Sequence, residues 1–309
     1  MFKILCLDGG GLRGYFTAQI IKNIEKRYNI KVNEYFDLVV GTSTGALIAG
    51  ALAIDINVDE IINMYIHENK NIFKDSMFKK GIFSSKYDIT TLNDLVKKAY
   101  KGKNFSDAKC NLIITTTNVN DSQPLAIASF DKNNNISLID AVTASSAAPI
   151  YFRPHKINNN YYCDGCIWAN NPSVIALSHA LDKKVFNKKI KDIALLSVGT
   201  GTSDAVSFDV SNNTWGMLSW GKNISSLFLK TNVIASENIV SSILGENFLR
   251  INFISNDKMN INEIPSEILL DTDRVFSLYE NQLDIFFKKC NKENIFKKVW
   301  KNLFKIRRK

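Results

Sequence analysis

The chain has 309 residues, of which 45% are hydrophobic and 22% are charged. This length and composition suit one large domain with a full core and exclude a chain that is disordered throughout. The nearest candidate for a membrane-spanning helix, 45–54, is about half as long as the roughly 18–20 residues required. The chain opens on a strand-like segment without a basic and apolar leader. This predicts a cytoplasmic protein, although delivery to another cell without a cleaved signal stays open.

The net charge of +9 is concentrated at the C-terminal end. Ten Lys and Arg residues and a single acid, Glu293, lie in 288–309, so this segment carries the whole excess and 1–287 is neutral. Apolar residues in 294–309 recur at steps of one, three and four, which predicts a helix with one apolar and one basic face. Two interpretations stay open: a helix docked on the core, or an interfacial helix that binds an anionic membrane surface. A neutral body argues against a nucleic-acid partner.

Strand-like and helical segments alternate through the first part of the chain. A buried strand at 2–7 is followed by a glycine-rich turn and a helix at 15–28. A second strand at 36–40 leads into another turn and a helix of small residues, and further helices are expected at 58–69 and 91–100. This alternation is typical of parallel strands joined by helical crossovers.

The pattern continues with paired strands at 111–119 and 123–130 and a helix that stops at Pro149. A short strand, a turn and a helix are expected across 161–181, and a core strand ending in glycine across 193–201. The sequence therefore predicts an α/β fold with a mostly parallel sheet between helices.

Three parts of the chain differ in pattern. Residues 1–204 form the expected core, and 205–287 form a variable region that caps or completes the same domain. Helices are expected at 267–287 and 292–306, the second of them within the basic tail 288–309.

The segment DGGGLRG, Asp8–Gly14, follows the first expected strand and opens the first expected helix. Its Gly9-x-Gly11-x-x-Gly14 spacing is typical of a dinucleotide-binding turn. Asp8 would place a negative charge against the pyrophosphate, and the next strand leads into a serine turn where a ribose-binding acid is expected. A nucleotide site is therefore disfavoured, because the same backbone N–H groups suit an oxyanion equally well.

The segment GTSTG, Gly41–Gly45, matches G-x-S-x-G between an expected strand and an expected helix. In this context the serine occupies a strained turn that exposes its hydroxyl at the edge of the sheet. The flanking glycines, Gly41 and Gly45, let the strand and the helix approach closely. The pattern predicts Ser43 as a nucleophile.

A serine nucleophile needs a base, and the chain has only three histidines: His67, His155 and His179. None has a convincing neighbourhood for a Ser-His-Asp triad, although His155 follows a turn that could approach a site. Asp164 is better placed, because it ends a short expected strand and precedes Gly165 and a helix. A turn or helix-capping role for this aspartate is the alternative.

The five cysteines are unevenly spaced and do not suggest a disulfide framework. Cys163 and Cys166 form a CxxC pair, which raises a metal or redox hypothesis. A second pair is missing and the intervening Asp-Gly is unlike a thioredoxin motif, so packing thiols beside a functional aspartate are the better interpretation.

The three elements Asp8–Gly14, Gly41–Gly45 and Asp164–Gly165 occur in the order and spacing of patatin-like phospholipases of the bacterial type. The segments TASSAAPIYFRP, WANNPS and LLSVGTG also resemble segments of that family. The resemblance spans 3–203, about two-thirds of the chain.

The resemblance implies a three-layer α/β/α fold with a mostly parallel central sheet and a helical C-terminal region. It also implies a Ser–Asp dyad, with Ser43 as nucleophile and Asp164 as the base that accepts its proton, and no cofactor or metal. The implied oxyanion hole is formed by backbone amides of Gly9, Gly10, Gly11, Arg13 and Gly14. The third motif departs from the usual Asp-Gly-Gly or Asp-Gly-Ala, because Cys166 stands at its last position.

We therefore expect a phospholipase A or lysophospholipase that releases fatty acid from phospholipids or lysophospholipids at the membrane surface. The alternative is a latent membrane-targeting effector whose hydrolysis requires a partner or a small-ligand activator.

Overall fold

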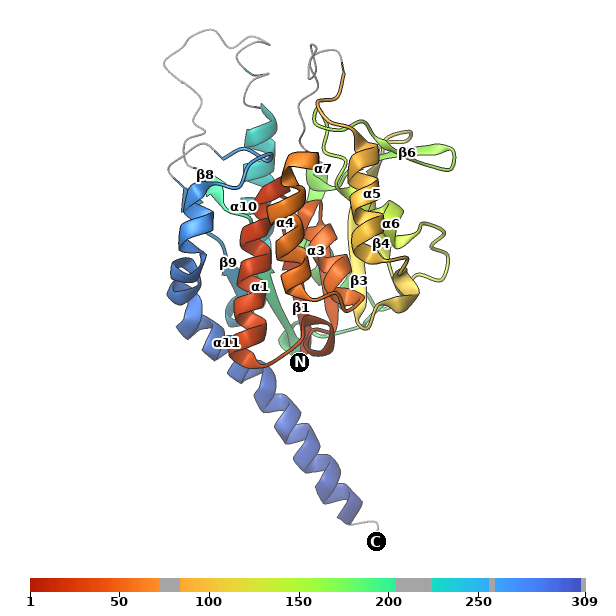
Figure 1. Ribbon diagram of the computed structural model, residues 1–309. Helices are drawn as coiled ribbons and strands as arrows, with labels where there is room; N and C mark the ends of the chain where they lie inside the picture. The colour runs from red at the N-terminus through yellow and green to blue at the C-terminus, as the bar shows by residue number, and fades with distance from the viewer. Residues whose placement is uncertain (73–83, 204–219, 221–223, 256–258, 307–309) are drawn as a thin grey trace.

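The computed structural model describes residues 1–72, 84–203, 220, 224–255 and 259–306 (Figure 1). Within these residues a mixed sheet of eight strands forms the centre of the molecule, in the order β5-β6-β3-β2-β1-β7-β9 with β4 beside β3. The strands are β1 (Phe2–Leu7), β2 (Leu38–Thr42), β3 (Asn111–Asn118), β4 (Gln123–Ala128), β5 (His155–Ile157), β6 (Asn160–Asp164), β7 (Ile193–Val198) and β9 (Phe248–Ile251). Strands β8 (Thr202–Ser203) and β10 (Ile254–Ser255) pair separately.

Strands β3, β2, β1, β7 and β9 run parallel, whereas β4 and β6 are antiparallel to β3. The central strands β1, β2 and β7 are buried on both faces over most of their length, which explains their continuous apolar sequences. The hairpin expected at 111–130 is confirmed, since β3 and β4 pair in register from Ile113↔Ala128 to Asn118↔Gln123.

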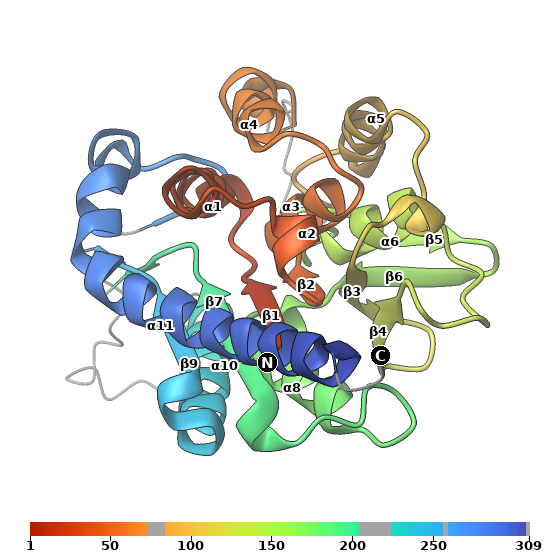
Figure 2. The same ribbon diagram turned by 90° about the horizontal axis from the view of Figure 1, so that it is seen from below.

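Helices cover both faces of the sheet (Figure 2). They are α1 (Gly14–Tyr28), α2 (Val32–Tyr35), α3 (Thr44–Ala53), α4 (Val58–Ile72), α5 (Ile89–Tyr100), α6 (Leu138–Ser145), α7 (Cys166–Ala169), α8 (Ser173–Leu181), α10 (Ile224–Leu244) and α11 (Ser266–Ile306). Short 3-10 turns occur at Gly11–Arg13, Phe105–Asp107, Ile190–Asp192 and Gly245–Asn247. The three-layer α/β/α architecture is thus confirmed.

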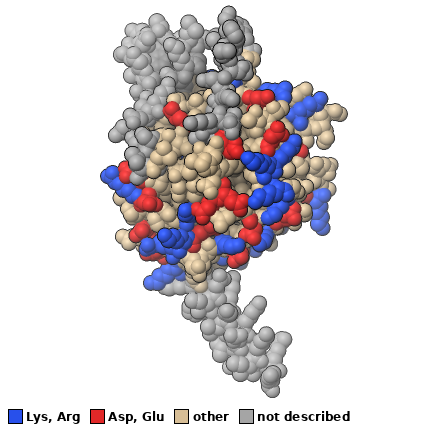
Figure 3. Space-filling model, in the orientation of Figure 1, with Lys and Arg blue, Asp and Glu red and all other residues tan. Residues whose placement is uncertain are grey.

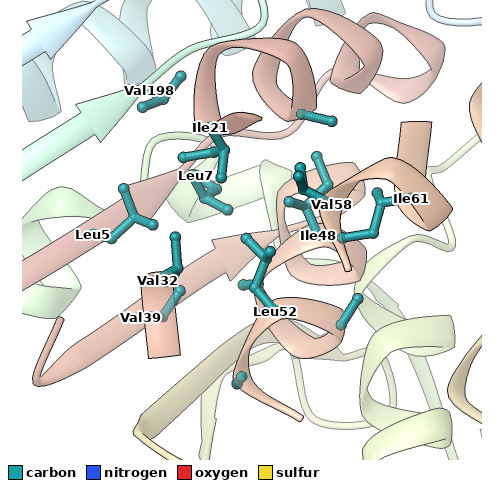
Figure 4. Close-up of a cluster of buried hydrophobic side chains, with 14 of the residues drawn as sticks. Leu5, Leu7, Ile21, Val32, Val39, Ile48, Leu52, Val58, Ile61 and Val198 are labelled. Carbon is teal, nitrogen blue, oxygen red and sulfur yellow. The ribbon is translucent and has the colours of Figure 1, made fainter. Parts of the chain in front are cut away.

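Strand alternation divides the core into two layers. Leu5 and Leu7 of β1 pack with α1, α3 and α4, where Ile21 and Ile48 are fully buried (Figure 4). Ile4 of the same strand faces the opposite layer, formed by α8 and α10. Each such buried side chain contributes about 1.5–3 kcal/mol of hydrophobic stabilisation, so both helical layers are firmly attached to the sheet.

The region that follows β7 contributes a strand as well as helices. β9 pairs in parallel with β7 from Leu195↔Phe248 to Val198↔Ile251, and so extends the sheet. The expected variable region 205–287 falls partly outside the described residues, because 204–219, 221–223 and 256–258 are not described.

The two helices expected at 267–287 and 292–306 are one continuous helix, α11, so the expected break between them is wrong. The physical reason is that neither proline nor glycine lies within 266–306 to end the helix. Phe276, Leu283 and Phe286 bury the first part of α11 against the core, and its last turns run beyond the body (Figure 1). The side chains after Asn291 lie outside the described residues, so neither interpretation of 294–309 is tested.

On the face shown in Figure 3, positive and negative side chains are interspersed, as the neutral composition of 1–287 predicts. Among the described helices, none combines the length and the apolar character that a bilayer span needs.

Candidate active site

Ser43 lies in a sharp turn between β2 and α3, with φ 55° and ψ −122°. This left-handed conformation is strained for a residue with a Cβ, as a nucleophile elbow requires. A Cβ on Gly41 would lie only 2.3 Å from the carbonyl oxygen of Gly45, so the turn needs glycine there. The Ser43 N–H donates to Ser145 Oγ at 2.9 Å, and Ser146 Oγ donates to the Ser43 carbonyl at 3.2 Å. The strained turn is therefore held from both sides.

Asp164 is the last residue of β6, opposite Thr116 of β3, and its side chain is only 1% exposed. Burial raises the pKa of this carboxyl to about 6, although the polar Ser43 side chain and the hydrogen bond from the Cys166 N–H oppose the increase. The Cys166 N–H donates to Asp164 Oδ1 at 2.8 Å. The two residues that the sequence singled out, 121 positions apart, therefore lie close enough for the Ser43 side chain to influence the pKa of Asp164.

The glycine turn lies between β1 and α1, and most of its N–H groups are used by the fold. The Gly9 N–H donates to the Asn170 carbonyl at 3.0 Å, that of Leu12 to Ile261 at 2.8 Å, and that of Arg13 to Gly10 at 3.3 Å. The Gly14 N–H is bonded within the same turn. For the N–H groups of Gly10 and Gly11, the described residues offer no acceptor.

The carbonyls on either side of these two N–H groups are fixed. Thr200 Oγ1 donates to the Gly9 carbonyl at 2.9 Å, and Arg13 Nε donates to the Gly10 carbonyl at 3.1 Å. In a trans peptide the N–H points opposite to the C=O, and all described peptides are trans. The Gly10 and Gly11 N–H groups therefore point away from Thr200 and from the Arg13 side chain, respectively.

A cavity of about 870 Å³ brings these groups together. Its lining includes Gly10, Gly11, Ser43, Asp164 and Cys166. Apolar side chains from α4, α5 and α10 form much of the remaining wall: Met64, Leu92, Leu95, Phe228, Leu229 and Val233. A reactive polar end within an apolar chamber suits a substrate that carries an ester on a hydrocarbon chain.

The model of the patatin-like phospholipase family matches residues 5–177, more than half of the chain and all three motifs. The chain belongs to this family. A cGAMP-activated phospholipase from Vibrio cholerae is 30% identical over 310 residues, which cover 89% of this chain and 87% of that protein. A second cGAMP-activated phospholipase, from Escherichia coli, is 29% identical over 87% of this chain and 83% of its own length.

Among solved structures, VipD from Legionella pneumophila is similar with a TM-score of 0.47 and 14% identity. The match covers 92% of this chain and 67% of VipD.

In this patatin-like chain the first residue of the glycine motif has a partner that the sequence analysis missed. Asp8 is 2% exposed, and Arg250 of β9 donates to both of its carboxylate oxygens, from Nη1 at 2.9 Å and from Nη2 at 2.5 Å. Arg250 Nη1 also donates to Ser197 Oγ at 2.7 Å. Burial lowers the pKa of Arg250, but the nearby carboxylate raises it by more, so the guanidinium stays charged. No motif spacing could have identified this pair, because 242 positions separate the two residues.

The histidines lie outside the described lining of the active-site cavity. His155 Nε2 is 2.9 Å from Asp140 Oδ1, and His179 Nδ1 is hydrogen-bonded to the Ile175 carbonyl. His67 lines a separate cavity of about 340 Å³. The approach of His155 to the site is therefore not seen.

Cys163 and Cys166 are free thiols. Burial raises the pKa of Cys163 to about 11 and that of Cys166 well above its ordinary value, which makes thiolate chemistry unfavourable. The described residues contain no cluster of three or more potential metal ligands.

Proposed function

We propose that this chain is a serine acyl hydrolase that cleaves ester bonds of phospholipids or lysophospholipids and releases fatty acid. The observation that carries the proposal is a single cavity lined by Ser43 in its strained turn, the buried Asp164 carboxyl and two backbone N–H groups that have no acceptor among the described residues. A nucleophile, a base and oxyanion donors are the parts that acyl transfer requires.

In the proposed reaction Asp164 accepts the hydroxyl proton while Ser43 Oγ attacks the acyl carbonyl carbon. The carbonyl oxygen becomes an oxyanion and accepts hydrogen bonds from the N–H groups of Gly10 and Gly11. Asp164 then gives its proton to the departing glycerol oxygen as the ester bond breaks. Water attacks the acyl-enzyme by the same route in reverse, and fatty acid leaves with Ser43 restored.

Thr200 and Arg13 act on this step as positioning residues. Their hydrogen bonds to the Gly9 and Gly10 carbonyls hold the two peptide planes before substrate arrives. Donors that are oriented in advance need no rearrangement when charge develops, which is why such groups stabilise a transition state strongly. In this proposal Gly9 and Arg13 contribute to the oxyanion hole through their carbonyl and side-chain contacts, respectively, because their N–H groups are already used.

We further propose that hydrolysis is latent until a cyclic dinucleotide binds. The support is the similarity, over more than 80% of both chains, to two proteins named for activation by cGAMP. A third relative, from Escherichia coli, is named for activation by cUMP-AMP and is 30% identical over 64% of this chain. The activator-dependent alternative is therefore preferred to constitutive turnover.

The test measures fatty-acid release from phospholipid vesicles by the purified full chain, with cGAMP, cUMP-AMP or no addition. We expect release to rise at least about tenfold with one cyclic dinucleotide, the order of a typical allosteric coupling. The matched linear dinucleotide should have no effect. Equal release in all conditions would contradict latency alone. Failure to hydrolyse vesicles or any soluble ester, with or without activator, would contradict the proposed hydrolase.

The pH dependence tests the role of Asp164. Because only the ionised carboxylate accepts a proton and burial raises its pKa to about 6, activity should fall as the pH drops through about 6. Below that value kcat/KM should decrease about tenfold per pH unit, since it follows ionisation in the free enzyme. Turnover of a soluble ester between pH 4.5 and 8 gives the profile, and melting temperatures across the range control for unfolding. A profile flat down to the ordinary carboxyl pKa of about 4 would contradict this role.

We propose that the basic tail 288–309 contacts anionic lipid and supports peripheral membrane association. Its composition is the support, because about 1 kcal/mol per basic residue near a charged bilayer suffices for reversible binding.

A further inference from the structure

Three apolar side chains line the active-site cavity and are also exposed to solvent. Ile150 is 56% exposed, Ile167 is 54% exposed and Phe228 is 63% exposed. A side chain that lines a cavity and is more than half exposed must lie at its mouth. We call these three residues the rim. Ile167 follows Asp164 by three positions, and both residues line the same cavity.

Backbone strain keeps one rim residue outward. Ile150 has φ 74°, a conformation that is unfavourable for a β-branched residue. The turn is held from a neighbouring segment, because the Lys86 N–H donates to the Ile150 carbonyl at 3.1 Å and the Tyr87 N–H donates to Tyr151 at 2.8 Å. An apolar side chain is thus exposed at a cost in local energy, and strain of this kind concentrates at functional sites.

The charges beside the rim have one sign. Among the described residues that line the cavity, the acids are Asp8 and Asp164, which are 2% and 1% exposed. The partly exposed charged residues of this lining are all cations: Arg13, Lys86, Lys230 and Arg250, the last of which is paired with Asp8. Apolar side chains next to cations complement a bilayer with anionic headgroups, which presents hydrocarbon below a negative surface.

The rim and the basic tail lie at opposite ends of the molecule. In Figure 1 the strands rise from the N-terminus, α7 and the start of α10 lie at the upper end, and the last turns of α11 leave the lower end. Ile167 belongs to α7 and Phe228 to the first turns of α10. A tail bound to lipid at the lower end would therefore leave the cavity mouth facing away from that bilayer.

We propose that Ile150, Ile167 and Phe228 insert into an anionic lipid surface and place the cavity mouth on it, independently of the tail. The inference rests on the proposed function in taking this cavity as the active site. It adds the face of the molecule that meets the membrane and the side chains that enter it. A phospholipid can then move from the bilayer into the cavity without exposing its acyl chain to water.

The experiment measures binding of the full chain to vesicles of phosphatidylcholine with phosphatidylglycerol by sedimentation. The rim variants are Ile150→Asn, Ile167→Gln and Phe228→Gln, of which Ile150→Asn also suits the left-handed backbone. The controls are Ile234→Gln, on α10 and 44% exposed, and Leu278→Gln, on α11 and 72% exposed; neither residue lines the cavity. A tail variant replaces Lys297, Lys298 and Lys301 by glutamine.

Each rim substitution should weaken binding about tenfold, as expected for loss of one buried large apolar side chain. The ratio of vesicle turnover to soluble-ester turnover should fall in parallel, whereas the two controls should match the wild type. Wild-type binding by all three rim variants would overturn the inference, as would an equal loss in the controls. Loss of vesicle binding in the tail variant alone, with wild-type binding by the rim variants, would also overturn the inference. Sedimentation measures binding and does not depend on hydrolysis. Absence of turnover on any ester would therefore contradict the proposed function, while the binding data would still test the rim.

Discussion

Replacement of Ser43 by alanine should lower fatty-acid release by about 10⁴- to 10⁶-fold, the usual effect of removing a catalytic nucleophile. The physical reason is that Ser43 occupies the strained turn and lines the same cavity as the buried Asp164 carboxylate. Asp164→Asn should have a comparable effect, because an amide cannot accept the proton.

The rate losses of the two single substitutions should not be additive in the double variant. If Ser43 and Asp164 act as one unit, the double variant should be no slower than the slower single variant. The measurement is release from vesicles with activator present, and melting temperatures show whether each variant is folded. Activity of Ser43→Ala close to that of the wild type would place the reaction elsewhere in the molecule.

Arg250→Met should destabilise the fold by about 3–5 kcal/mol, because it leaves the Asp8 carboxylate buried without its partner. The pair is largely inaccessible to water, with side-chain exposures of 7% and 3% for Arg250 and Asp8. Urea unfolding followed by circular dichroism measures the loss. The double variant Asp8→Asn/Arg250→Met should recover part of it, since no unpaired charge then remains.

An exposed ion pair provides the matched control. Arg27 contacts Glu280 at 3.3 Å and Asp284 at 2.9 Å, and its side chain is 35% exposed. Arg27→Met should cost less than about 1 kcal/mol, as surface pairs usually do. Equal losses for Arg27→Met and Arg250→Met would show that burial of the Asp8 pair carries no special weight.

Arg250 also connects stability with the site. It anchors Asp8 at the start of the glycine turn, while Thr200 and Asn170 hold Gly9. The turn is therefore fixed by three segments that come later in the chain. For this reason, in an Arg250→Met protein that still folds, kcat should decrease by a larger factor than KM increases.

Local motifs were readable in the sequence because they depend on backbone geometry over a few residues. A left-handed serine between close-packed Gly41 and Gly45 requires those residues at those offsets, whatever surrounds them. The same holds for Gly11, whose φ of 62° and contact with the Ile261 carbonyl favour glycine. The parallel α/β core was also predictable, because strands buried on both faces give continuous apolar runs.

Contacts between residues far apart in the chain could not be predicted from such local patterns. Thr200 lies within a segment that the sequence analysis noted, but its contact with the Gly9 carbonyl joins residues 191 positions apart. The separation of the end of α11 from the cavity mouth depends on how the helix docks on α1. The sequence alone determined the nucleophile turn, the glycine turn and Asp164 as candidates, because short-range sterics specify them. Only the tertiary structure decided which N–H groups remain available, what holds Asp8 and which face carries the rim, because those follow from packing between distant segments.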